Sequence, residues 1–413
     1  MKRRHITAMF GLMIMAMAVG ISVCAEENTD AAAQAIADRK EEAEESGEYE
    51  KVVFAFYNWT GRPAGTDRIQ EKINERIRDT LGLEVELLVM DSAAYTQNAR
   101  LMLSSGEQID IWNSCPLGYT ACVNDGYCLD LEEDDLIQTY GQGILDTVNA
   151  DYVQACRVSG TLYGLPQMRD MAMGAGAYCI GQEYLDGIGF DYTSMYEDPE
   201  NPDIIYTDYE TLDNIFAQLH EKYPDKYVFA ISDNMIGQGT IVDSVGGDYF
   251  GVLLDPANSL QVENLFTSDI FKETCQRVYE WNQKGYISQD AVTNDTALSA
   301  QVKSGSYMSM MAQAKPGYST QISGECGRPM VVFQVEPDIM KSSAVTGILW
   351  HLNQGCEDPI AAMQLLNAFY TDPELSNLII WGEEGTDYIV TEDGHITFPE
   401  GVNADNSEWY HTM

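Results

Sequence analysis

The feature that most constrains the fold is an alternation of buried strands and amphipathic helices near the start of the chain. Residues 52–59, VVFAFYNW, form the continuous apolar run that a strand covered on both faces requires. A helix with an apolar stripe begins near Asp67 and ends at Gly82, and a second strand, LEVELLVM, follows directly. This alternation predicts an α/β fold built on mainly parallel sheets with right-handed crossovers.

The stretch LSSGEQIDIWNS, residues 103–114, ends a third strand with an indole beside two small polar side chains. Gly106 stops the preceding helix, and the strand ends in Trp112 and Asn113. The first strand ends similarly, in Trp59. Because ligands of open α/β sheets bind beyond the carboxyl ends of the strands, both indoles are expected at one rim. There each Trp either contacts a ligand or covers the core of the domain.

The amino terminus has the order of an export signal. A basic start, MKRRH, precedes an almost wholly apolar run over residues 6–23, and small residues follow. This order predicts a signal peptide over residues 1–25, outside the fold. Two processing hypotheses remain open: cleavage after Ala25, or a lipoprotein signal in which Cys24 is diacylated. The protein is therefore expected to be exported, and either anchored at the cell surface through Cys24 or secreted.

The net charge of the chain excludes several classes of partner. It carries 23 basic and 65 acidic residues, which gives a formal charge of 23 − 65 = −42. Such a field repels nucleic acid and anionic lipid surfaces, and it favours a soluble monomer. Residues 26–50 hold ten of the acidic residues and are expected to form a solvated tether, in part helical.

The cysteines predict neither a metal site nor a disulfide framework. Eight remain after Cys24: Cys115, Cys122, Cys128, Cys156, Cys179, Cys275, Cys326 and Cys356. No pair has the C-x-x-C spacing, and no histidine lies at ligand spacing from any of them. A chain of this size needs no covalent staples, so free and mostly buried thiols are expected. No cofactor is expected either.

Signs of catalysis are weak. The acidic run DLEEDD at residues 130–135 is more typical of a solvated loop than of an acid and base pair, and it lacks the glycine and spacing of an EF-hand loop. The chain has no G-x-S-x-G nucleophile elbow, no P-loop and no dinucleotide fingerprint. We therefore predict a protein that is not an enzyme.

Seven segments carry a family resemblance in both sequence and order. They are LMLSSGEQIDIWN, SGTLYGLPQ, SVGGDYF, NQKGYISQDA, VKSGSYMSM, AQAKPG and AAMQLLNAFYTDPEL. In this order they resemble the extracellular solute-binding proteins that serve ABC importers. The nearest group is similar to family 1, which includes maltose-binding protein, and within it to the lipoprotein type of gut Firmicutes.

The resemblance implies a two-lobe clamshell with mainly parallel sheets, flanking helices and a hinge. Lobe 1 would hold residues 51–166 and 304–358, and lobe 2 would hold residues 167–303 and 359–413. Proteins of this type usually continue further at the carboxyl end, and whether this chain is a shortened form that lacks a final helical piece of lobe 2 stays open.

The implied function is capture of an oligosaccharide, or a similar polar solute, in the cleft between the lobes and its delivery to an ABC permease. Sugars require flat apolar faces beside planar polar groups. The candidate ligand-binding residues are Asn58, Trp59, Trp112, Asn113, Gln167, Arg169, Tyr178, Gln238, Lys315, Tyr318 and Trp350, with His351 next to the last. Two alternatives stay open: a secreted carbohydrate-active enzyme, and a clamshell sensory or surface protein.

Overall fold

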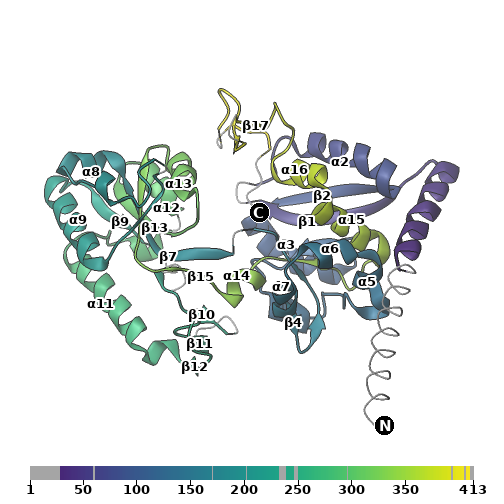
Figure 1. Cartoon of the computed structure of the whole chain (residues 1–413), viewed down its shortest axis with the longest axis horizontal. Helices are drawn as coiled ribbons and strands as arrows, with labels where there is room; N and C mark the ends of the chain where they lie inside the picture. Colours follow the sequence, from purple (N-terminus) through teal and green to yellow (C-terminus); the bar gives the residue numbers. More distant parts are fainter. Residues whose placement is uncertain are drawn as a thin grey trace, which may run out of the picture. The chain divides into compact units, whose positions relative to one another are not determined.

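The computed structural model describes residues 28–58, 61–169, 171–200, 202–231, 239–245, 250–294, 296–391, 394–403 and 406–409. The predicted signal peptide with Cys24, and the predicted site residues Trp59 and Gln238, lie outside these described residues. The chain divides into two compact units, unit 1 with Met1–Met168 and Thr346–Met413, and unit 2 with Arg169–Val345 (Figure 1). In the part of the chain described, no helix combines the length and apolar character needed to cross a membrane.

Unit 1 is built on a five-stranded sheet with the order β2-β1-β3-β16-β6. Its strands are β1 (Glu50–Asn58), β2 (Leu83–Asp91), β3 (Ile111–Asn113), β6 (Leu165–Pro166) and β16 (Leu349–Leu352). β1 is parallel to β2 and β3, and helices α2 (Thr66–Leu81) and α3 (Ser92–Ser105) make the crossovers. The stripe predicted for α2 is its buried face, with Ile69, Ile73 and Ile77 fully covered. The predicted α/β class is confirmed.

Shorter elements complete unit 1. They are α4 (Tyr119–Asn124), α5 (Leu136–Tyr140), α6 (Gln142–Thr147), α7 (Ala150–Ala155), the hairpin β4 (Arg157–Val158) with β5 (Thr161–Leu162), α15 (Pro359–Thr371), α16 (Pro373–Ile380), and the hairpin β17 (Ile389–Val390) with β18 (Ile396–Thr397). The first hairpin turns at Ser159 and Gly160, both with positive φ, as a two-residue hairpin turn requires. Pro359 and Pro373 begin their helices at positions where a missing N–H costs no helical hydrogen bond.

Unit 2 has a mixed sheet with the order β8-β14-β7-β13-β9, and β15 pairs with β7. The strands are β7 (Ala172–Gly181), β8 (Ile204–Tyr206), β9 (Tyr227–Ala230), β13 (Tyr307–Ala314), β14 (Met330–Gln334) and β15 (Asp338–Met340). A small second sheet contains β10 (Asp243–Ser244), β11 (Val252–Leu253) and β12 (Val262–Glu263). The helices are α8 (Gln182–Ile188), α9 (Tyr209–Lys222), α11 (Asp269–Gln283), α12 (Leu298–Lys303), α13 (Tyr318–Cys326) and α14 (Ser342–Thr346).

The division into units differs from the predicted lobes in two places. Residues 304–345 belong to unit 2 because β13 pairs with β7 and β9, and β14 pairs with β7 and β8. Residues 359–413 belong to unit 1, where α15 contacts α5 and α6 and α16 contacts α2. The predicted second crossing near 301–304 lies instead at 345–346. Strand and helix periodicity marks an element but not the sheet it joins, which explains the difference.

The segment predicted as a solvated tether is helical from residue 28 to 46 and packs on unit 1. Arg39 and Ala43 are buried, and they share one helix face with Ala32. The Arg39 guanidinium donates to Gln364 Oε1 on α15, and Gln364 Nε2 donates to the Ala32 carbonyl at 2.8 Å. The high acidic content conceals this buried face, which consists of Arg39 and two alanines, so residues 28–46 form a packed helix and not a solvated tether.

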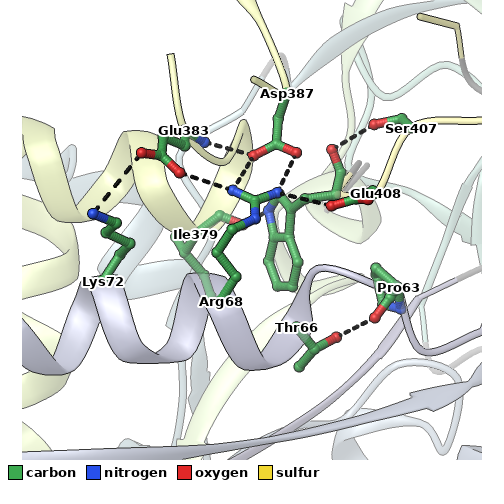
Figure 2. A network of polar contacts seen from close by, with 10 residues as sticks. Pro63, Thr66, Arg68, Lys72, Ile379, Glu383, Asp387, Ser407 and Glu408 are labelled. Carbon is green, nitrogen blue, oxygen red and sulfur yellow. Dashed lines mark hydrogen bonds and ion pairs between the residues drawn. The ribbon is translucent and has the colours of Figure 1, made fainter. Parts of the chain in front are cut away.

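A charged cluster fastens the carboxyl-terminal segment, residues 382–409, to α2 (Figure 2). Arg68 of α2 reaches Asp387 at 2.7 and 3.0 Å and Glu383 at 3.1 Å. Asp387 is 2% exposed, and its Oδ2 also accepts the Glu383 N–H at 2.8 Å. Near the end of the segment, the buried Trp409 donates from Nε1 to the Ile379 carbonyl at 3.2 Å. The described part of this segment is therefore attached at two places: by the bidentate Arg68–Asp387 ion pair and by the buried Trp409.

Replacing Arg68 with Ala is expected to destabilise unit 1 by about 2–3 kcal/mol, because Asp387 would remain buried without its cation. Lys72 is the matched control, since it lies one turn along α2, is 42% exposed and reaches Glu383 at 3.9 Å. Lys72→Ala should change stability by less than about 0.5 kcal/mol. Urea denaturation of both variants measures the difference. Equal losses would show that Asp387 does not depend on Arg68.

Candidate functional site

Several predicted site residues come together at one edge of the unit 1 sheet. β16 is antiparallel to β3, and β6 is antiparallel to β16, so the carboxyl ends of β1, β3 and β6 meet the amino end of β16. In this register Trp350 lies opposite Asn113. We call this edge the unit 1 rim and define it as Asn58, Asn113, Ser114, Gln167 and Trp350. It is the carboxyl edge at which α/β sheets bind ligands.

The polar side chains of the unit 1 rim are deeply buried. Exposure is 2% for Asn58, 0% for Asn113, 1% for Ser114 and 6% for Gln167. Asn113 Oδ1 accepts the Cys115 N–H at 2.7 Å. Among the described residues, however, Asn113 Nδ2, Ser114 Oγ and Gln167 Oε1 have no hydrogen-bond partner. Buried polar atoms are nearly always paired, so three unpaired ones at one edge indicate a place for water or a bound molecule.

An aromatic face lies beside these amides. Side chains alternate along a strand, and the pairing places Trp350 and Asn113 on the same face of the sheet. The Trp350 ring is half-buried and packs edge-on against Phe54 at 4.8 Å between centroids. Backbone contacts fix the position of Asn113, since the Tyr95 hydroxyl donates to its carbonyl at 2.6 Å. The rim thus combines a rigid indole with planar hydrogen-bonding groups.

A corresponding edge occurs in unit 2, where β8, β14, β13 and β9 end together. We call it the unit 2 rim, and its residues are Tyr206, Lys315, Gln334 and Asp338. The Tyr206 hydroxyl donates to Asp338 Oδ2 at 2.8 Å, and Gln334 Nε2 donates to Asp338 Oδ1 at 2.7 Å. Burial, together with Asp338, raises the pKa of Tyr206 to about 12. Gln334 is fully buried, and its Oε1 has no partner among the described residues. Lys315, a predicted site residue, follows β13 at this edge.

Charged groups accumulate next to the unit 2 rim. Arg277 stacks on the Tyr209 ring, with its central carbon 3.3 Å from the ring centroid. Burial raises the pKa of Glu336, and the nearby Arg277 and Lys341 oppose that shift. Lys341 is 7% exposed and donates to the Thr240 carbonyl at 2.8 Å, and burial lowers its pKa. These groups can present fixed charges to a polar ligand.

Sequence reasoning missed these unit 2 groups. Tyr206 and Gln334 each end a strand, which is the same signal that selects Asn58 and Asn113 in unit 1. The signal was available for β8 and β14. To place the ends of β8 and β14 at one edge, one must know that β14 pairs with β8 on one side and with β7 on the other. No local sequence pattern reveals these pairings.

Comparison with known proteins identifies the fold. No family model matches the chain. It is 22% identical over 376 residues to a carbohydrate ABC transporter substrate-binding protein of Streptococcus pneumoniae, covering 91% of this chain and 71% of that protein. The crystal structure of the N-glycan transport solute-binding protein from the same species matches with a TM-score of 0.73 at 20% identity, covering 87% of this chain and 76% of that one. The chain has the solute-binding-protein fold.

A further structure of the N-glycan transport protein, in complex with Man5GlcNAc, matches with a TM-score of 0.68 at 20% identity over 88% of this chain and 77% of that one. The predicted resemblance to solute-binding proteins of ABC importers is confirmed by these matches. In this fold the two rims described above are the carboxyl edges of the two sheets.

Trp112, which prompted the prediction of a rim, lies on the other face of its sheet. It is 1% exposed in a core cluster with Tyr57 and Tyr95. Its ring lies 4.8 Å from that of His351, which in turn stacks on Tyr119 at 5.2 Å. This burial favours the hypothesis that Trp112 covers the core, and ligand contact by Trp112 stays a prediction.

His351 is held neutral inside the solute-binding fold. Its Nδ1 lies 2.6 Å from the Tyr163 carbonyl, which can only accept, so Nδ1 carries the proton. Burial lowers the pKa of His351 to about 4, and the hydrogen bond that Nδ1 donates to the Tyr163 carbonyl opposes the shift. A Cβ on Gly164 would meet His351 Cε1 at 2.5 Å, which explains the glycine. The imidazole packs here as an aromatic ring.

Three other predicted site residues lie elsewhere in unit 2. Tyr178 is 1% exposed in an aromatic core, 5.9 Å from the Trp281 ring, and burial raises its pKa. Tyr318 begins α13 and is 9% exposed in a second core cluster. Arg169 donates to the Ala344 carbonyl at 2.9 Å. Ligand contact by these residues stays a prediction.

Neither the acidic run DLEEDD nor Glu50 belongs to a rim, whereas Cys115 directly follows Ser114 of the unit 1 rim. Within DLEEDD, Glu132 pairs with Arg157 at 2.7 Å. Burial and Asp358 raise the pKa of Glu50 to about 7, but Glu50 begins β1, at the end opposite the rim. Among the described residues no group of three potential ligands is arranged to hold a metal ion. Five of the eight cysteines are buried, two are half-buried, and Cys275 is exposed.

The low pKa of His351 makes the stability of unit 1 depend on pH. The unfolded state takes up the proton near pH 6.5 and the folded state near pH 4, so stability is full above pH 6.5 and falls as the pH decreases toward 4. We expect a loss of about 2 kcal/mol by pH 5 that His351→Phe removes. Urea denaturation at several pH values tests this. An unchanged profile in the variant would contradict it.

Replacing Trp112 with Ala is expected to lower stability by about 3–5 kcal/mol, as for other large aromatics removed from a core. Thermal melting measures the loss, and calorimetric titration with a ligand measures binding on the same sample. A variant that melts normally but binds weakly would instead place Trp112 in ligand contact.

Proposed function

We propose that this protein is an extracellular solute-binding protein that captures an oligosaccharide and presents it to an ABC permease. The observation that carries the proposal is the unit 1 rim, where three buried hydrogen-bonding atoms that have no partner among the described residues lie at the same edge as the Trp350 ring. A pyranose offers C–H faces to an indole and hydroxyl groups to amides and hydroxyls, so it satisfies both kinds of group together.

Each rim, taken by itself, offers hydrogen-bonding groups that suit such a ligand. In unit 1, Asn113 Nδ2 would donate to a sugar oxygen, while Gln167 Oε1 would accept from a sugar hydroxyl. In unit 2, Gln334 Oε1 would accept in the same way, and Lys315 would donate. The N-glycan transport protein, solved with Man5GlcNAc, supports an oligosaccharide as the ligand class.

The proposal extends to partners and location. The protein would act outside the cell as a monomer, anchored through a lipidated Cys24 or freed by cleavage after Ala25, and would deliver its ligand to a permease without chemical change. Relatives named as binding proteins support a role without catalysis. The alternatives are a secreted carbohydrate-active enzyme and a sensory clamshell. Turnover of oligosaccharides by the purified protein would favour the enzyme.

A matched pair of glutamine variants tests the unit 1 rim. Gln167→Met keeps the side-chain volume but removes an Oε1 that has no partner in the described structure, so the fold should tolerate it. We expect the Kd for Man5GlcNAc to rise about tenfold, the equivalent of one lost hydrogen bond. Gln138→Met is the control, because Gln138 Oε1 is also buried and unpartnered but belongs to α5.

Isothermal titration calorimetry measures both affinities, after a thermal-shift screen over oligosaccharides has established binding. Equal effects of the two variants would show that the rim is not the site. A screen in which no saccharide raises the melting temperature would overturn the proposed function itself.

A further inference from the structure

Exposed apolar side chains concentrate in one short part of unit 2. Of the fourteen large apolar side chains that are exposed in the described residues, six lie between residues 245 and 279. They are Val245, Phe250, Leu260, Val262, Phe266 and Tyr279. Single exposed apolar residues are ordinary, but a contiguous group usually marks a binding surface.

Part of this group borders a pocket of about 530 Å³. Its walls are Phe266 and Phe271, whose rings meet edge to face at 5.2 Å, and one face of α11. On that face Lys272, Gln276 and Tyr279 follow one another at helical spacing. No residue of either rim lines this pocket.

The polar groups in the pocket are available to a ligand. Among the described residues, the Asp269 carboxylate, the Lys272 ammonium and the Tyr279 hydroxyl have no side-chain hydrogen bond or ion pair. Tyr279 is 63% exposed and Phe266 is 46% exposed, so both rings can be covered. The pocket therefore offers aromatic faces alternating with a free acceptor and free donors.

We propose that this pocket is a second saccharide-binding site, which holds one pyranose unit of a glycan. The ligand class rests on the proposed function, but the pocket itself does not. The C–H face of the sugar would lie on Tyr279 or Phe266, and neighbouring hydroxyls would donate to Asp269 and accept from Lys272. An apolar protein segment fits less well, because it would bury the Asp269 and Lys272 charges without hydrogen bonds.

Such a site would act by effective concentration. A glycan held weakly by one branch keeps its other branches at a raised local concentration, and a second contact within their reach then raises the overall affinity. An open pocket of this kind is expected to bind weakly by itself, with a Kd on the order of 1 mM.

Two cysteines allow the two sites to be followed separately. Cys275 is exposed and lines the pocket, whereas Cys115 is half-buried and follows Asn113 and Ser114 of the unit 1 rim. Alkylation by N-ethylmaleimide, quantified for each cysteine by peptide mass spectrometry, is measured with and without Man5GlcNAc at up to about 10 mM. We expect the glycan to slow alkylation of Cys275.

Two variants test whether the protection of Cys275 comes from a glycan bound in the pocket. Tyr279→Ala should weaken the protection of Cys275 about threefold to tenfold and leave that of Cys115 unchanged. Leu260→Ala is the control, since Leu260 is 85% exposed in the same region but does not line the pocket. Protection of Cys115 alone would support the proposed function and overturn the second site. Protection of Cys275 that Tyr279→Ala does not alter would overturn it as well.

A final measurement tests whether the pocket is occupied by a second copy of the chain instead of a glycan. If Cys275 becomes protected when the protein concentration is raised without glycan, the pocket is a contact between copies of the chain, and the saccharide proposal fails.

Discussion

Backbone pairing between β3 and β16 is the contact on which unit 1 depends. It joins parts of the chain that are far apart, since Leu352 of β16 pairs with Ile111 of β3. Just beyond the two strands, Asn353 Nδ2 donates to the Ile109 carbonyl at 2.9 Å. Asp110 reinforces the junction, because its carboxylate accepts the Val53 N–H at 2.7 Å and its carbonyl accepts the Asn353 N–H at 2.9 Å. This pairing places Trp350 opposite Asn113, so the candidate site forms only after the chain has returned from unit 2.

The sequence predicts those elements of the fold that a local pattern defines, but not which strands pair with one another. β1, α2 and β2 follow from apolar periodicity and from Gly82, which ends the helix with a positive φ. Asn58 and Asn113 follow from their place at strand ends. The partner of each later strand was not predictable, because β13 and β14 join the unit 2 sheet through pairings with β7 that no neighbouring residue encodes.

The same limit applies to the candidate site. The place of Trp112 at a strand end does not reveal on which face its indole lies, and the pairing that decides this comes from His351. The buried amide of Gln334 was missed for a similar reason. In both units the unpaired polar atoms stand in rigid surroundings, and each costs about 1–3 kcal/mol while it lacks a partner. A ligand that hydrogen-bonds to them recovers that free energy without reorganising the protein.

The buried thiols have a consequence for the chemical durability of the protein. Burial raises the pKa of Cys122 to about 11, that of Cys326 to about 11 and that of Cys156 to about 12. The thiolate is the form that reacts with oxidants and disulfides, so at neutral pH these sulfurs are almost inert in the folded state. The unfolded chain has no such protection. Folding must therefore be faster than oxidation if these buried cysteines are to stay reduced in an oxidising medium.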